Sequence, residues 1–204
     1  MDNPTGNNYS DKQLVDRVLR GNTQAFGIIV KNTETLVAQI VFKMVGPAED
    51  RKDIAQDIYL KVFRKLDSFR FESKLSTWIA QVAYNTCLSW LEKKKLVLPG
   101  NLHEANDAHE AALEHLHNKS AGLTGGETDR PVLLKERSGI IQQEIGRLPP
   151  VYATLITLYH QEELSYEEMA QITGLPEGTV KSYLFRARKM LKENLLSKYK
   201  KEAL

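Results

Sequence analysis

Residues 164–191 carry the spacing of a helix-turn-helix, which restricts the fold of this chain more than any other segment. Ser165 and Glu168 form the pattern of a capping box, in which each side chain accepts a hydrogen bond from the other residue's backbone N–H at a helix start. Gly174 supplies a tight turn, and Pro176 suits the first turn of the next helix because its φ angle is already helical. The spacing predicts two helices joined by a sharp turn, an arrangement that places the second helix in a DNA groove.

The second of these helices has an apolar face and, opposite it, a cationic face. At 100° per residue, the buried side is expected to consist of Val180, Leu184, Ala187 and Leu191. The candidate DNA contacts are Lys181, Ser182, Phe185, Arg186 and Lys189, with Arg188 beside Lys181 on one shoulder. An exposed Phe among cations is unfavourable on a free surface, but in a major groove its ring can contact thymine methyl groups. A solvated basic helix at the end of a domain is the alternative explanation.

The rest of the chain also has helical periodicity, without the alternation that is typical of strands. Apolar residues recur at helical spacing over residues 11–20, 23–45, 48–65, 75–95, 135–147 and 150–162. We therefore predict an all-α fold with two helical domains joined by a flexible linker, the C-terminal domain containing the helix-turn-helix. The predicted boundaries are 10–96 for the first domain, 97–134 for the linker and 135–201 for the second domain.

The predicted linker is acidic and rich in histidine. Residues 99–134 contain 2 basic and 6 acidic side chains, whereas residues 175–201 contain 8 basic and 2 acidic ones. The linker holds four of the chain's five histidines, which are His103, His109, His115 and His117. Their spacing is not that of a zinc site and the single cysteine, Cys87, adds no partner ligand, so we expect no metal. The simplest role for this segment is a soluble tether.

Other classes of protein are disfavoured by what the sequence lacks. The N-terminus is polar and has no apolar run behind it, so no signal peptide is expected. The most apolar stretch, Leu36 to Val45, is interrupted by Gln39 and Lys43 and is shorter than the ~18 residues of a membrane span. A Gly-rich phosphate loop and a nucleophile elbow are missing, so we expect neither an enzyme nor a bound cofactor. The sequence predicts a soluble, cytoplasmic protein without membrane insertion.

Two segments resemble bacterial sigma factors of the extracytoplasmic-function (ECF) group. The first contains the strings DIAQDIYLKVFRKL and STWIAQVAYN, which resemble the N-terminal region of that family. The second is RLPPVYATLITLYHQEELSYEEMAQITGLPEGTVKSYLFRARKML, which resembles the C-terminal, promoter-reading region. The resemblance implies a transcription initiation factor that binds core RNA polymerase, directs it to the −10 and −35 elements of promoter DNA and assists strand opening. It also implies an anti-sigma factor as a partner.

The resemblance also assigns roles to residues of the first domain. The residues implied to bind core polymerase are Asp53, Gln56 and Asp57. Those implied to contact the −10 element are Phe69, Arg70, Trp78, Gln81, Asn85 and Lys93. Opened strands need aromatic planes and amide groups for unstacked bases, and Trp78 and Asn85 carry these groups. Without the resemblance, the polar residues are equally a solvated helix face, and Trp78 is equally a packing residue.

The chain departs from the family pattern in its second domain. It has Ala153, Tyr159 and Tyr183 where the family often has arginine, and Glu163 where the family often has glycine. Fewer arginines imply weaker independent binding to the −35 element and a greater dependence on polymerase. The alternative function is a stand-alone helix-turn-helix regulator with an N-terminal sensing or dimerisation domain. Such a regulator would bind its promoter without polymerase, whereas a sigma factor would co-purify with the core enzyme.

Overall fold

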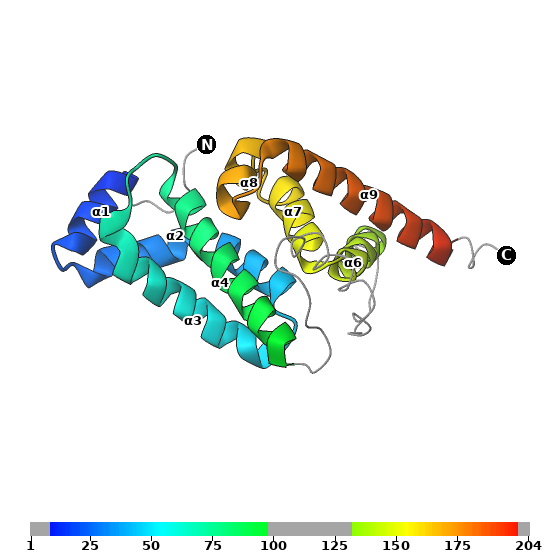
Figure 1. The fold of residues 1–204 in the computed structure, drawn as a ribbon, viewed down its shortest axis with the longest axis horizontal. Coiled ribbons are helices and arrows are strands. Elements are labelled where there is room, and N and C mark those ends of the chain that lie inside the picture. The colour runs from blue at the N-terminus through cyan, green and yellow to red at the C-terminus, as the bar shows by residue number, and fades with distance from the viewer. Residues whose placement is uncertain (1–8, 98–131, 200–204) are drawn as a thin grey trace. The chain divides into compact units, whose positions relative to one another are not determined.

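The computed structural model describes residues 9–97 and 132–199, and within these ranges every regular element is a helix (Figure 1). The first module (residues 9–97) contains α1 (Asp11–Leu19), α2 (Thr23–Met44), α3 (Ala48–Lys65), the short 3-10 helix η1 (Leu66–Ser68) and α4 (Leu75–Val97). The second module (residues 132–199) contains α6 (Val132–Gly146), α7 (Pro150–His160), α8 (Tyr166–Thr173) and α9 (Glu177–Tyr199). The all-α prediction is confirmed. Most of the predicted linker lies outside the described residues, as do its four histidines.

Local signals set the ends of the first helices. At the start of α1, Ser10 Oγ accepts from the backbone N–H of Gln13 at 3.3 Å, and the Gln13 side chain accepts from the Ser10 N–H at 3.0 Å. After α1 the chain turns at Gly21, whose φ is +91°, and Asn22 then caps α2 by accepting from the N–H of Ala25 at 3.1 Å. These contacts satisfy backbone groups that have no partner within the helix, so they fix where each helix begins.

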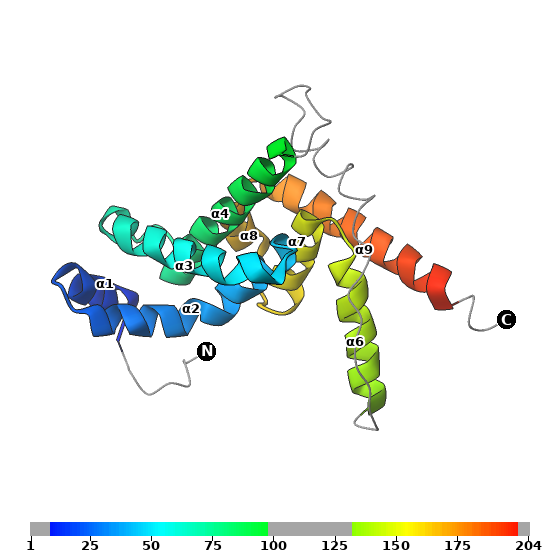
Figure 2. The ribbon, with the colours of Figure 1, turned by 90° about the horizontal axis from the view of Figure 1, so that it is seen from below.

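Helices α1 to α4 enclose one apolar core (Figures 1 and 2). Its side chains with no more than 1% exposure include Ile29, Ile40, Met44, Ile58, Val62, Ile79 and Tyr84. Burial of each large apolar side chain contributes about 1.5–3 kcal/mol, which is the main stabilisation of this module. Cys87 lies in the same core, and burial raises the pKa of its thiol to about 12. The thiol therefore stays protonated at neutral pH.

Helix α2 is long and strongly apolar. Among the residues that the structure describes, it is the one helix long and apolar enough to cross a membrane by length and composition alone. A core helix of a soluble protein meets the same criteria, and Ile29, Ile40 and Met44 place one face of α2 in the core. Its apolar character is therefore explained by packing within the first module.

The second module is built around α7, which packs against α9. Pro150 occupies the first turn of α7, where a missing N–H removes no intrahelical bond. Leu155 and Leu158 of α7 and Leu184 of α9 are each 0% exposed, and they form the centre of this core. The C-terminal part of α9 extends beyond α7 (Figures 1 and 2).

Glu144 anchors this C-terminal part of α9 to α6. Its carboxylate is 1% exposed, and Oε1 accepts from Arg147 Nη1 at 2.6 Å and from Lys198 Nζ at 3.1 Å. Removing the charge from a buried acceptor leaves its cationic partners without compensation. We expect Glu144→Gln to lower the free energy of unfolding of the second module by about 1–2 kcal/mol, measured by urea denaturation followed by circular dichroism.

A matched control lies on the exposed surface of α9. Glu193 pairs with Lys189 at 4.0 Å, and both side chains are more than 60% exposed. Such a pair contributes at most a few tenths of a kcal/mol, so Glu193→Gln should leave the unfolding midpoint almost unchanged. Equal effects of the two substitutions would show that the buried pair does not anchor α9.

Candidate nucleic-acid interface

The turn between α8 and α9 has the geometry that the sequence predicts. Glu168 N–H donates to Ser165 Oγ at 3.1 Å, and Ser165 N–H donates to Glu168 Oε2 at 3.0 Å, which completes the capping box. Gly174 ends α8 with a φ of +72°, a conformation that side chains with a Cβ rarely adopt. Three residues on the inner face of α9 are fully buried: Val180, Leu184 and Ala187. One face of α9 is therefore packed in the core of the second module, and the opposite face is exposed to solvent.

The free side of α9 carries all the residues predicted to contact the −35 element. Lys181, Ser182, Phe185, Arg186 and Lys189 are all exposed. Phe185 is 68% exposed, more than any other large apolar side chain in the described residues. Two of the cations have acidic neighbours on the same helix, because Lys181 pairs with Glu177 at 3.4 Å as Lys189 does with Glu193. These exposed pairs are weak and can exchange for phosphate contacts.

Ser182 is bonded within its own helix. Its single hydroxyl proton is shared between the carbonyl oxygens of Gly178 at 3.1 Å and Thr179 at 3.0 Å. Both bonds are exposed, and a hydroxyl can rotate to exchange them for another donor or acceptor.

The loop before α8 contains a strained residue. Glu163 has a φ of +53°, in the left-handed region, which costs a residue with a Cβ about 1–2 kcal/mol relative to the right-handed region. Glycine, which the ECF family often has at this position, avoids that cost. We expect Glu163→Gly to raise the free energy of unfolding by about 0.5–1 kcal/mol, since part of the gain is offset by the greater freedom of glycine in the unfolded chain.

The comparison for this prediction is Glu163→Ala, which removes the same charge but keeps a Cβ. Thermal melting of both variants separates backbone strain from charge. If Glu163→Ala stabilises the protein as much as Glu163→Gly does, the strain at this position is not the cause.

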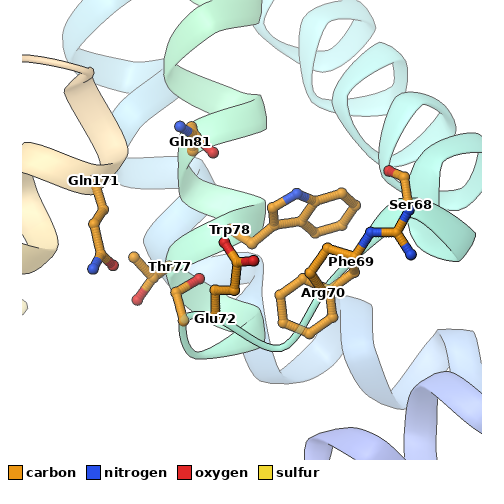
Figure 3. Close-up of a pocket in the computed structure, with 9 residues that line it drawn as sticks. Ser68, Phe69, Arg70, Glu72, Thr77, Trp78, Gln81 and Gln171 are labelled. Carbon is orange, nitrogen blue, oxygen red and sulfur yellow. The ribbon is translucent and has the colours of Figure 1, made fainter.

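In the first module, the segment between η1 and α4 brings three aromatic rings together. The ring centroid of Phe69 lies 4.7 Å from that of Phe71 and 5.3 Å from that of Trp78. Figure 3 shows the rings of Phe69 and Trp78 side by side. Phe69 is only 6% exposed, whereas Phe71 is 45% exposed. The structure therefore places Phe69, a predicted base contact, beneath the surface, where its ring supports the other two. Phe71, which belongs to the same loop, is the more exposed of its two phenylalanines.

Phe71 also has an unusual backbone. Its φ is +59°, a conformation that is costly for a bulky residue and persists only where the surroundings impose it. One such constraint is the start of α4, where the N–H of Leu75 donates to Asp11 Oδ2 of α1 at 3.0 Å. Strained residues cluster at binding sites, so this loop is the part of the first module best suited to hold a ligand in a fixed geometry.

Four of the other predicted −10 contacts lie on α4, and Arg70 lies in the loop before it. Trp78 and Gln81 are half-buried and lie one turn apart, so they present part of an indole and an amide on neighbouring positions (Figure 3). Arg70, Asn85 and Lys93 are exposed. The segment thus combines aromatic, amide and cationic groups, which is the chemistry that binds unstacked bases and phosphates.

The residues predicted to bind core polymerase lie on α3. Asp53 and Gln56 are exposed, and Asp57 is half-buried and pairs with Lys61 at 2.7 Å. Asp57 is therefore partly neutralised by a neighbour on its own helix. The spacing of four residues between Asp57 and Lys61 is the signal that reveals this pair.

A metal site is not found within the described residues. Over 9–97 and 132–199, no group of three or more histidine, cysteine, aspartate or glutamate side chains is arranged to hold an ion. The four histidines of the predicted linker (His103, His109, His115 and His117) fall outside these ranges.

Comparison with known proteins identifies both modules. The family described as Sigma-70 region 2 matches residues 29–97, and the family described as Sigma-70, region 4 matches residues 138–191. The RNA polymerase sigma-H factor of Pseudomonas aeruginosa is 32% identical over 185 residues, which cover 91% of this chain and 93% of that protein. The ECF RNA polymerase sigma-E factor of Escherichia coli K12 is 34% identical over 182 residues, which cover 89% and 92%.

Solved structures share the same fold. CnrH, in complex with the cytosolic domain of CnrY, matches with a TM-score of 0.60 and 21% identity over 93% of this chain and 99% of that one. The sigma factor RpoE of Bartonella quintana, in complex with the anti-sigma factor NepR, matches with a TM-score of 0.59 and 21% identity over 83% and 96%. From the matches along both modules, the chain belongs to the ECF sigma factors, non-enzymatic subunits that direct RNA polymerase to promoters through a −10-reading region 2 and a −35-reading region 4.

Proposed function

We propose that α9 of this sigma factor reads the major groove of the −35 element through its exposed face. The residues of this face are Lys181, Ser182, Phe185, Arg186 and Lys189. The observation that carries the proposal is the 68% exposure of Phe185 among cations. Exposure of a large apolar side chain to water is unfavourable, and its burial against thymine methyl groups is favourable.

The first module has the chemistry to bind the −10 element and to assist strand opening. Trp78 and Phe71 offer ring faces to unstacked bases, and Gln81 and Asn85 offer amide groups to base edges. Arg70 and Lys93 are exposed cations for the DNA backbone. The ring centroids of Phe69 and Trp78 lie 5.3 Å apart, so the buried Phe69 ring supports the indole from below.

Two protein partners complete the proposal. The polar side of α3, with Asp53, Gln56 and Asp57, is assigned to core RNA polymerase. An anti-sigma factor is proposed as a second partner, because CnrH and the Bartonella RpoE are both described in complex with another chain, in the second case an anti-sigma factor. ECF sigma factors act in the cytoplasm, and this chain is proposed to do the same.

In vitro transcription tests the proposal directly. The full chain with core RNA polymerase is expected to start RNA synthesis at discrete sites on a library of genomic fragments, and the aligned start sites give the promoter sequence. Phe185→Ala is expected to reduce these transcripts. Leu196→Ala, which truncates an exposed apolar side chain about three helical turns further toward the C-terminus of α9, is expected to preserve them. Absence of discrete starts with the unmodified chain would refute the promoter-reading role.

Nuclease protection distinguishes a sigma factor from a stand-alone regulator. A regulator would protect specific promoter DNA from nuclease digestion without polymerase. We expect protection of a defined site only when core polymerase is present, because this chain has Ala153, Tyr159 and Tyr183 where the resemblance leads us to expect phosphate-binding arginines.

A further inference from the structure

Two tyrosines form a stacked pair beside the recognition helix. Tyr159 lies in the last turn of α7 and Tyr166 is the first residue of α8. Their ring centroids are 5.3 Å apart and the ring planes differ by 12°, so the rings are stacked. The hydrogen bond between the two hydroxyls raises the pKa of Tyr159 and lowers that of Tyr166. The pair therefore links the ends of two helices through both ring faces and hydroxyls.

Each ring carries a cation from α9. The Arg188 guanidinium lies 5.0 Å from the ring centroid of Tyr159, and the Lys181 ammonium lies 5.3 Å from that of Tyr166. Both distances are within the range of a cation–π interaction, which holds the cation in place at an exposed site. Since Lys181 and Arg188 are seven residues apart, they lie on the same side of α9, adjacent to the recognition face.

Two other titratable groups, His160 and Glu177, lie beside these cations. Tyr159 also contacts His160 edge-to-face, with ring centroids 4.9 Å apart. Desolvation, and then the charge of Arg188, lower the pKa of His160 below its usual value of 6.5. The imidazole is therefore mostly neutral at pH 7. Glu177 pairs with Lys181 at 3.4 Å through an exposed contact, so Arg188 is the less neutralised of the two cations.

We infer that Tyr159 and Tyr166 are positioning residues that hold Arg188 and Lys181 as a two-cation site for the backbone phosphates of the −35 duplex. The inference rests on the proposed role of α9. Tyr159 supplies no charge of its own, and instead holds a charge that another helix provides.

The physical gain lies in the conformational entropy of the arginine. A long side chain that is mobile before binding loses rotamer freedom when it contacts a phosphate, and this loss weakens binding. A ring that already holds the guanidinium beside the groove removes part of that loss. Removing the ring should therefore weaken DNA binding without changing how many phosphates are contacted.

The experiment measures binding of the full chain to a fluorescein-labelled DNA duplex of mixed sequence, by anisotropy, over a series of KCl concentrations. We expect Arg188→Ala to reduce the slope of log K against log salt by about 1, as for one lost phosphate contact. Tyr159→Ala should weaken binding about 3- to 10-fold with the slope unchanged. Tyr159→Phe keeps the ring but loses the hydroxyl that bonds to Tyr166 and Arg188, so it should weaken binding less than Tyr159→Ala does.

A double substitution separates positioning from a general structural effect. Tyr159→Ala combined with Arg188→Ala should bind no more weakly than Arg188→Ala alone, because the ring then has no cation to hold. Additive losses, or equal losses in Tyr159→Phe and Tyr159→Ala, would overturn the inference. If Tyr159→Ala does not fold, as judged by circular dichroism, Tyr159→Leu retains the bulk and takes its place in the cycle.

The duplex assay is independent of promoter recognition. The proposed function fails if transcription lacks discrete starts, whereas the inference fails if Arg188→Ala keeps the unmodified salt slope. Each result can therefore be obtained without the other.

Discussion

Replacing Asp57 by arginine is expected to abolish binding to core RNA polymerase. The carboxylate is half-buried and pairs with Lys61 at 2.7 Å on the polar side of α3. Arginine at this position reverses the charge and places two cations one helical turn apart, in a surface proposed to bind polymerase through acidic and amide groups. Co-purification of core polymerase with the tagged protein measures the loss, and transcription should disappear with it.

The fold should survive this substitution. An exposed ion pair contributes at most about 1 kcal/mol, so the helical circular dichroism signal and a melting transition should remain. Asp16→Arg is the matched control, because it makes the same change of charge at an exposed position of α1. If both variants lose polymerase to the same extent, net charge rather than the α3 surface is responsible. If Asp57→Arg still co-purifies with polymerase, the assignment of α3 is wrong.

Replacing Arg186 by alanine is expected to lower promoter use by about 5- to 150-fold. This range corresponds to about 1–3 kcal/mol, the contribution of one good contact between an arginine and a base. Arg186 is exposed on the recognition face of α9. Run-off transcription from a set of promoters with each −35 position randomised measures both the loss and its dependence on sequence.

The pattern of the loss identifies the contact. If Arg186 reads a base, the variant should relax the preference at one −35 position and leave the others unchanged. Arg186→Lys keeps the charge but cannot form the two parallel hydrogen bonds of a guanidinium, so it should show the same relaxation. A uniform loss over all sequences, restored by lysine, would instead assign Arg186 to a phosphate.

Much of the fold could be predicted because its signals are local. The capping box of Ser165 and Glu168, the turn at Gly174 and the apolar spacing of α9 each act over a few residues. The same holds for the outward face of α9, because a helix anchored by Val180 and Leu184 has only one side left for solvent. Helix starts such as Ser10 likewise depend on contacts within three or four positions.

The features that the sequence could not predict depend on residues far apart in the chain or on loops without periodicity. Nothing in the order Phe69, Arg70, Phe71 tells which ring is buried, because the backbone between them follows no regular pattern. The stacking of Tyr159 on Tyr166 requires the path of the loop between α7 and α8, and the placement of Arg188 requires α9 as well. These contacts emerge only when the helices pack.

The bond between Asp11 and the start of α4 has a practical consequence. Because Asp11 opens α1, the first turn of this helix is joined to the end of the loop that carries Phe69 and Phe71. A protein shortened past Asp11 would leave the Leu75 amide without this acceptor, although every residue of the loop itself is intact. Truncations from the N-terminus should therefore keep Asp11.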